Sequence, residues 1–280
     1  RDRAIEYGKG RQGHDLTGYP ARVGAWERIG DKAFIENSAR WKDQACHRSV
    51  YSHQLRTALQ LAVENPQRAV TFAGYACSGA EIIDGLFQIY KGNEWVPKPP
   101  TKSQISFAAE AQCGRNEAVQ ETFPATYDLG GDLPSLKDLT VYRCPRDKAR
   151  KIDLVLLSVG GNDVGFARLV ANAVLSDQSS LKMLGGWMGH VHGAKEATPG
   201  LQQLDLRYKA LNRALRNILH IPWGESDRII LSAYPPLAIM EDGKSICPDG
   251  RGGMSVYPDF TFNSQRAGEG EQVAAKLHEG

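Results

Sequence analysis

The stretch KIDLVLLSVGGNDVGFARLV, residues 151–170, decides the fold of this chain. Residues 152–159 form a near-continuous apolar run, which predicts a strand buried on both faces of a parallel sheet. Two glycines, an Asn and an Asp follow, and residues 164–175 then show the apolar spacing of a helix. This order predicts that Asn162 lies at the carboxyl end of a strand, where open α/β sheets bind their ligands. The competing interpretation is a tight turn in which Asn162 only caps the helix.

Two further segments predict strands of the same sheet. Residues 68–75 carry β-branched and aromatic side chains and lead into a turn of small residues, and residues 228–233 form a third apolar run. Helices are expected over residues 49–65 (with Ser49 as N-cap), 82–90, 104–121, 198–218 and 265–278. The alternation predicts one domain over residues 1–280, a three-layer α/β/α sandwich with a parallel central sheet and long loop insertions.

Two segments are predicted to lie outside the regular sandwich. Residues from about 91 to 150 are polar and rich in proline, and we interpret them as an insertion over one rim of the sheet, without a strong strand. Residues 176–200 are expected to be irregular. In the helix that follows, Arg207 and Lys209 are expected on the charged face, away from the apolar side.

The composition is that of a soluble globular protein, with 41% hydrophobic and 24% charged residues. A net charge of +2, with Lys and Arg scattered along the chain, argues against a nucleic-acid partner. No apolar run approaches the roughly 20 residues of a membrane-spanning helix, so no integral membrane segment is expected. We expect a monomer.

The cysteines are spaced too widely for a zinc finger, and they favour disulfides in an exported protein over reduced core thiols. They are Cys46, Cys77, Cys113, Cys144 and Cys247. Their odd number leaves one without a partner in this chain. His190 and His192 form a His-x-His pair, but without a third ligand nearby they predict a surface loop. No metal and no organic cofactor are expected.

Local candidates for a nucleophile are weak. Ser49 lies between His47 and His53, but groups so close to a helix start are usually capping or solvated. Ser78 lacks the G-x-S-x-G pattern of a nucleophile elbow. The Gly-Asp-Lys sequence at 30–32 ends in a residue without a hydroxyl.

Three blocks in order nevertheless form a recognisable set: Cys-His-Arg-Ser at 46–49, Ala-Cys-Ser-Gly-Ala at 76–80, and Val-Gly-Gly-Asn-Asp-Val-Gly-Phe at 159–166. Together they resemble the SGNH hydrolases, also called GDSL-type esterases and lipases, and most closely their secreted, disulfide-containing bacterial branch. The resemblance implies that Gly79 and Asn162 form an oxyanion hole. The supporting residues are Gly160, Gly161, Asp163 and Ser78. Serine ester hydrolysis needs such fixed donors at the oxygen that becomes negative.

The nucleophile and the base of that family are missing from these residues. The chain has no Gly-Asp-Ser and no Asp-x-x-His, and Ala275 stands three residues before His278. We therefore expect a fragment that is incomplete at both ends, with the catalytic Ser and His outside it. The resemblance further implies a Cys46–Cys77 disulfide, a partner for Cys247 outside the fragment, and a secreted or periplasmic protein. Cys113 and Cys144 are taken as the second pair.

Two functions from different classes remain open. The first is a serine esterase or lipase that acts on a small ester, a lipid or an acylated carbohydrate. The second is a non-catalytic SGNH-like domain that binds a glycan or another ligand. The presence of both Gly79 and Asn162 favours the first, because a binding domain has no use for an oxyanion hole.

Overall fold

The computed structural model describes residues 42–43, 45–92, 99–114, 117–123, 139–187, 189, 191–232, 234, 236, 238–251 and 260–277. The chain divides into two compact units. Among the described residues, unit 1 comprises Gly165–Thr198 and Pro235–Lys276, and unit 2 comprises Lys42–Val164 and Pro199–Tyr234. Residues 30–32, His190 and His278, which the sequence singled out, lie outside the described residues.

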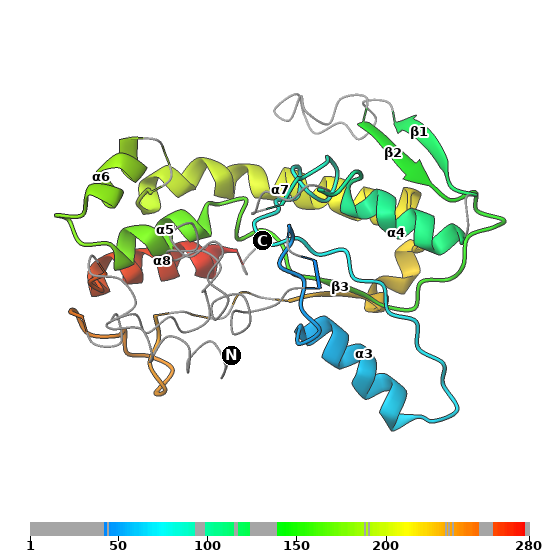
Figure 1. Ribbon diagram of the computed structural model, residues 1–280, viewed down its shortest axis with the longest axis horizontal. Helices are drawn as coiled ribbons and strands as arrows, with labels where there is room; N and C mark the ends of the chain where they lie inside the picture. The colour runs from blue at the N-terminus through cyan, green and yellow to red at the C-terminus, as the bar shows by residue number, and fades with distance from the viewer. Residues whose placement is uncertain are drawn as a thin grey trace, which may run out of the picture. The chain divides into compact units, whose positions relative to one another are not determined.

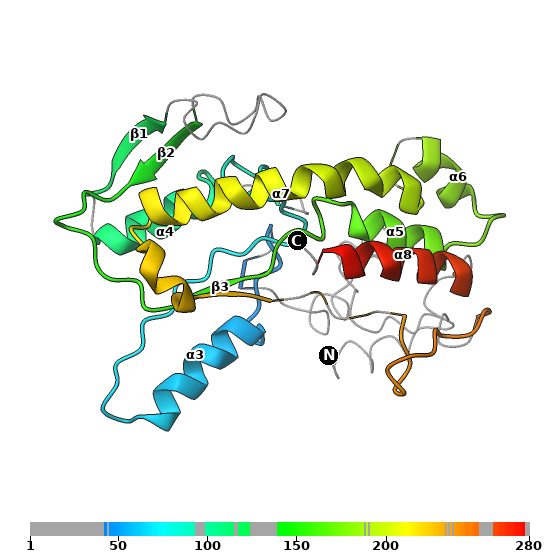
Figure 2. The ribbon, with the colours of Figure 1, turned by 180° about the vertical axis from the view of Figure 1, so that it is seen from behind.

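Unit 1 is helical in its described part. Helices α5 (Phe166–Val174) and α8 (Ser264–Lys276) lie side by side (Figure 1; Figure 2). A small buried core that contains Ala173, Phe262 and Ala267 forms beside them. The ends of both helices lie within two residues of the predicted ends, because each segment has the required apolar spacing. Helix α5 begins directly after Gly165, whose φ is 72°.

Residues 176–200 are more regular than the sequence predicts. Helix α6 (Ser180–Trp187) lies within them, and α7 (Ala194–Asn217) begins before the expected start at Thr198. Pro199 therefore lies inside the first turns of α7 and does not open it. Pro199 is the sixth residue of α7 and has no N–H to donate to the carbonyl of Lys195, so the helix lacks one backbone hydrogen bond there.

One of the two small sheets of unit 2 is a short parallel pair. Strand β3 (Val155–Leu157) pairs with β4 (Ile229–Leu231), which follows the 3-10 helix η3 (Trp223–Arg228). The chain is thus mixed α and β with a parallel strand pair, as predicted, while its described residues form no three-layer sandwich. Both strands are shorter than their apolar runs and only partly buried, because each has just three paired residues.

The segment at 68–75 is not a strand, contrary to the prediction. Its residues are mostly exposed, with Phe72 40% exposed, and none of them belongs to a ladder in the described part of the chain. The guanidinium of Arg48 donates to the carbonyl of Gly74 at 3.0 Å. A strand forms only where a neighbour takes its N–H and C=O groups, so β-propensity alone was insufficient here.

The predicted helix at 82–90 is also wrong. This segment is a series of tight turns with isolated bridges, and it buries Ile82, Ile83, Leu86 and Phe87. Gly85 has a φ of 131°, which no helix contains, and a Cβ there would come within 2.4 Å of the Cβ of Ala80. The apolar spacing therefore marks a buried coil.

The insertion at 91–150 contains a helix and a hairpin. Helix α4 (Gln104–Cys113) ends at Gly114, whose φ is 80°, so the expected continuation to residue 121 does not occur. Strands β1 (Val119–Phe123) and β2 (Leu139–Arg143) then pair antiparallel, and β2 packs on α4 (Figure 1). The prediction that this region has no strong strand is thus wrong, because residues 119–123 pair along their whole length with β2, whose alternate residues Leu139 and Val141 are buried.

Helix α3 (His53–Glu64) is the predicted first helix of unit 2. Its N-cap is Ser52, whose hydroxyl accepts from the N–H of Leu55, and not the predicted Ser49. The hydroxyl of Ser49 accepts from the N–H of Tyr51 in the preceding turn. Across all described helices, none combines the length and apolar character needed to cross a bilayer.

Candidate functional site

The first turn of the candidate site contains Gly79. Its φ of 84° requires a residue that tolerates the left-handed region. The turn is closed by a hydrogen bond from the N–H of Ala80 to the carbonyl of Cys77, 3.1 Å long. The N–H of Ser78 donates to the carbonyl of Cys46, also at 3.1 Å, and a disulfide joins Cys46 to Cys77. These links anchor the Gly79 turn to the 46–49 block.

The second turn follows β3 and contains Asn162. Gly160 has a φ of 110°, and a Cβ on it would lie 2.2 Å from the hydroxyl of Tyr208. A Cβ on Gly161 would lie 2.5 Å from the ring of Tyr234. Both glycines are thus required by the two tyrosines that cover the turn, which explains the Gly-Gly pair of the opening stretch.

The structure brings these two turns together. The side-chain Nδ2 of Asn162 donates to the carbonyl of Ala80 at 2.9 Å, and these residues are 82 positions apart in the chain. Two positions after Ala80 and one after Asn162, the N–H of Ile82 donates to the carboxylate of Asp163, at 3.1 and 3.2 Å to its two oxygens. Gly79 and Asn162 therefore belong to two turns that are joined by hydrogen bonds.

The donors of this arrangement carry no charge. The carboxamide of Asn162 has two N–H groups, and its bond to Ala80 uses one of them, so the other can serve a ligand. Gly79 adds a backbone N–H on the neighbouring turn. A backbone amide and a carboxamide held by the fold can stabilise a negative oxygen without reorganising, as an oxyanion hole requires. Asn162 is partly exposed and Ser78 is exposed.

A buried ion network lies behind the two turns. The side chain of Asp163 is fully buried, and Nη1 of Arg207 donates to its Oδ1 at 2.6 Å and to Oε2 of Glu81 at 2.9 Å. Burial raises the pKa of Asp163, while the bonds from Arg207 and from the N–H of Ile82 oppose that rise. The prediction that Arg207 faces solvent is wrong, because its long side chain turns back to these carboxylates and is only 13% exposed.

The hydroxyls of the two covering tyrosines remain protonated at neutral pH. Burial, with the nearby charge of Asp163, raises the pKa of Tyr208 to about 12, and burial also raises the pKa of Tyr234. The hydroxyl of Tyr208 can therefore donate to the carbonyl of Val159, 2.9 Å away. This bond connects α7 to the last residue before the Gly-Gly pair.

An open groove of about 500 Å³ lies within unit 2, between α7 and the β3–β4 pair. Its lining is mainly apolar and includes Leu157, Val159, Leu211, Leu215, Leu231 and Tyr234. Val159 directly precedes the Gly-Gly pair, and Tyr234 covers Gly161. The groove thus begins beside the Asn162 turn and can accept an apolar group.

Both predicted disulfides are present. Cys46 is bonded to Cys77 and Cys113 to Cys144, whereas Cys247 is a free, partly buried thiol. Each closed pair spans 31 positions and lies in unit 2.

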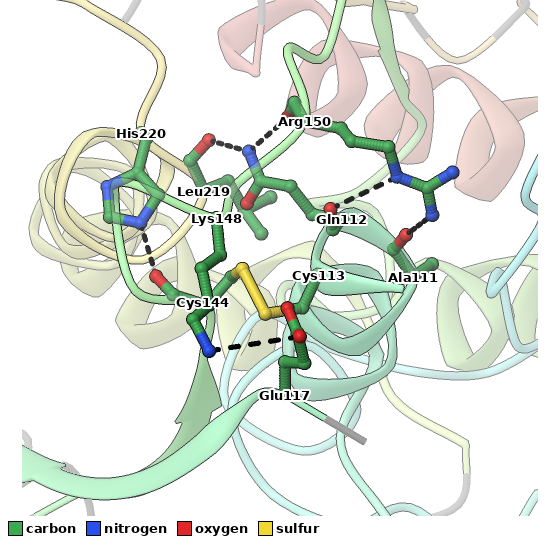
Figure 3. The surroundings of a disulfide bond; sticks show 9 residues. All are labelled: Ala111, Gln112, Cys113, Glu117, Cys144, Lys148, Arg150, Leu219 and His220. Atoms are coloured by element: carbon green, nitrogen blue, oxygen red, sulfur yellow. Dashed lines mark hydrogen bonds and ion pairs between the residues drawn. A yellow bond between two sulfur atoms is a disulfide. The ribbon is translucent and has the colours of Figure 1, made fainter. Parts of the chain in front are cut away.

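Figure 3 shows the surroundings of the second disulfide. The amide of Gln112 donates to the carbonyl of Leu219, and Nε2 of His220 donates to the carbonyl of Cys144, at 2.9 and 2.7 Å. Cys144 is completely buried and Cys113 nearly so. This disulfide therefore ties α4 to the residue after β2, and the two hydrogen bonds link both to the segment after α7.

The remaining sequence candidates do not assemble into a site. His47 and Ser49 lie in the turns before α3, His53 is its first residue, and His192 lies beside Gly165 in unit 1. Within the described ranges, no group of three or more His, Cys, Asp and Glu side chains could hold a metal ion. Comparison of the chain with family models, with curated proteins and with solved structures gave no match.

Proposed function

We propose that this chain is the interior of a serine ester hydrolase of the SGNH type, with Gly79 and Asn162 as its oxyanion hole. The observation that supports this most is the 2.9 Å hydrogen bond from Asn162 to Ala80, which sets the Asn162 turn against the Gly79 turn. Two uncharged donors on rigid turns suit an acyl transfer, whose transition state places negative charge on one oxygen.

The proposed reaction uses a Ser and a His from outside residues 1–280. The Ser hydroxyl attacks the ester carbonyl carbon while the His takes its proton. The carbonyl oxygen becomes negative and accepts from the N–H of Gly79 and from the second N–H of Asn162. The oxyanion then collapses, the alcohol leaves with the proton from His, and water hydrolyses the acyl-enzyme to the acid and free Ser.

The wider proposal concerns fold, substrate and location. We propose that β3 and β4 belong to the parallel sheet of a three-layer α/β/α sandwich, in keeping with their strongly apolar runs and with the exposed fractions of 48% for Ile230 and 49% for Leu231. The apolar groove beside Asn162 suits the acyl part of a lipid, an acylated carbohydrate or another ester. Two disulfides favour an oxidising compartment, so the protein is proposed to be secreted or periplasmic.

Turnover of p-nitrophenyl acetate tests this proposal. We expect the full-length protein to hydrolyse the ester and residues 1–280 alone to be inactive, because their sequence contains neither Gly-Asp-Ser nor Asp-x-x-His. The comparison variant is Ser78→Ala in residues 1–280 alone, which should be as inactive as the unchanged residues. Turnover by residues 1–280 that disappears in Ser78→Ala would assign the nucleophile to Ser78 and overturn the proposal. A full-length protein that hydrolyses no ester but binds a glycan would favour the binding-domain alternative.

A further inference from the structure

We infer that Arg207 is a positioning residue that holds the Gly79 and Asn162 turns in register, an inference that rests on the proposed function. The two N–H groups of its Nη1 reach one carboxylate on each turn. Glu81 is the second residue after Gly79, and Asp163 is the residue directly after Asn162. One guanidinium from α7 therefore connects both sides of the proposed oxyanion hole.

Asp163 transmits this connection to the backbone. Its buried carboxylate accepts the N–H of Ile82 through both oxygens, and Ile82 itself is completely buried. The bond from Asn162 to Ala80 lies two residues away on the same turn. Movement of Asp163 would thus shift Ile82, Ala80 and the donor N–H groups together. A displacement of about 1 Å at such groups can lower turnover on the order of a hundredfold.

The helix that carries Arg207 is itself fixed against the Asn162 turn. A Cβ on Gly200 would lie 2.7 Å from the carbonyl oxygen of Asp163, so α7 approaches this backbone as closely as a glycine permits. Seven and eight residues further along the same helix face, Arg207 bonds Asp163 and Tyr208 bonds the carbonyl of Val159. Leu204, between them on this face, is buried. The part of α7 that carries the Arg207 side chain is therefore held firmly against the Asn162 turn.

The simpler role for Arg207 is to neutralise a buried charge. Removing one partner of a buried ion pair is strongly destabilising whatever the site does, so loss of folded protein alone would not show positioning. A planar guanidinium differs from a point charge because it fixes the direction of both bonds. The two roles therefore make different predictions for turnover when the charge is balanced in another way.

The experiment measures kcat and KM of folded full-length variants together with hydrogen exchange at the Ile82 amide. Arg207→Met is expected to lower kcat about a hundredfold with KM changed less than about twofold, and to speed exchange at Ile82 at least about tenfold. Arg207→Lys should recover part of kcat. The matched control is Lys195→Met, at an exposed position of the same helix outside the groove lining, which should leave all three quantities unchanged.

The double variant Asp163→Asn, Arg207→Met separates the two roles and protects the test against misfolding. It removes both fully or nearly buried charges and leaves only the carboxylate of Glu81, which is 32% exposed, without the Arg207 cation, yet it cannot connect Glu81 to α7. We expect it to fold and to retain the low kcat of the single variant. Wild-type kcat in the double variant, or wild-type exchange at Ile82 in a folded Arg207→Met, would overturn the inference.

Failure of the proposed function and failure of the positioning role of Arg207 give different experimental results. A wild-type protein without esterase activity would refute the function, while exchange at Ile82 and the side-chain amide resonances of Asn162 still report whether Arg207 holds the two turns. Unchanged exchange and resonances in Arg207→Met would refute the positioning role in either case. Altered exchange and resonances, with Lys195→Met unchanged, would support it.

Discussion

Asn162→Ala in the full-length protein is expected to lower kcat for an ester by about a hundredfold to a thousandfold. The variant removes the side-chain donor that the proposed oxyanion hole aims at the developing charge, which typically costs about 2.7–4 kcal/mol in the transition state. The binding of the substrate in its ground state should change little, so KM is expected to stay within a few-fold. Steady-state kinetics with p-nitrophenyl esters measures both quantities.

The control for Asn162→Ala is Asn65→Ala, at an exposed position after α3 where the side chain accepts only from the nearby N–H of Gln67. This variant should hydrolyse the ester at the wild-type rate. Near-normal kcat in a folded Asn162→Ala protein would contradict the assignment of Asn162. Loss of the Ala80 bond also weakens the contact between the turns, so thermal unfolding should be recorded for both variants.

Gly160→Ala is expected to lower the free energy of unfolding by about 3 kcal/mol or more. The methyl group would lie 2.2 Å from the hydroxyl of Tyr208, and the φ of 110° is strained for any residue with a Cβ. Adding Tyr208→Phe should recover part of the loss because it removes the closest atom, while the backbone strain remains. Urea unfolding measures these differences.

Gly186→Ala provides the matched control for Gly160→Ala. Gly186 lies in α6, and no other atom comes within 4 Å of its added Cβ. Alanine is the better helix former, so this variant should be unchanged or more stable, by up to about 1 kcal/mol. If Gly160→Ala were as stable as Gly186→Ala, the close packing of Tyr208 on the Asn162 turn would be wrong.

The candidate site was predictable where the sequence constrains its backbone. A strand followed by Gly160 and Gly161 predicted a tight turn, and the structure explains both glycines by positive φ or by a covering tyrosine. The block order also predicted that Gly79 and Asn162 belong to one site, and their turns are joined by a hydrogen bond. The same resemblance predicts the Cys46–Cys77 disulfide, which is present, as is the separately assumed Cys113–Cys144 pair.

The rest depended on partners that a linear sequence does not name. Residues 68–75 have strand-forming side chains but no ladder among the described residues, and residues 82–90 have helical spacing that Gly85 interrupts. Helical periodicity predicts that Arg207 lies on the charged face of its helix, away from the apolar side. Its acceptor Asp163 lies 44 positions away in the sequence. The burial of that carboxylate cannot be inferred from the residues next to it in the sequence. The sequence feature that could have indicated this contact is the position of Arg207 at the edge of the apolar face of α7.

The most direct test of the account is the structure of the full-length protein after reaction with an alkyl fluorophosphonate, which places a tetrahedral oxygen where the oxyanion forms. The account predicts an adduct on a Ser outside residues 1–280, with the phosphoryl oxygen within hydrogen-bond distance of both the N–H of Gly79 and Nδ2 of Asn162. An adduct whose oxygen meets neither donor, or a protein that forms no adduct, would contradict it.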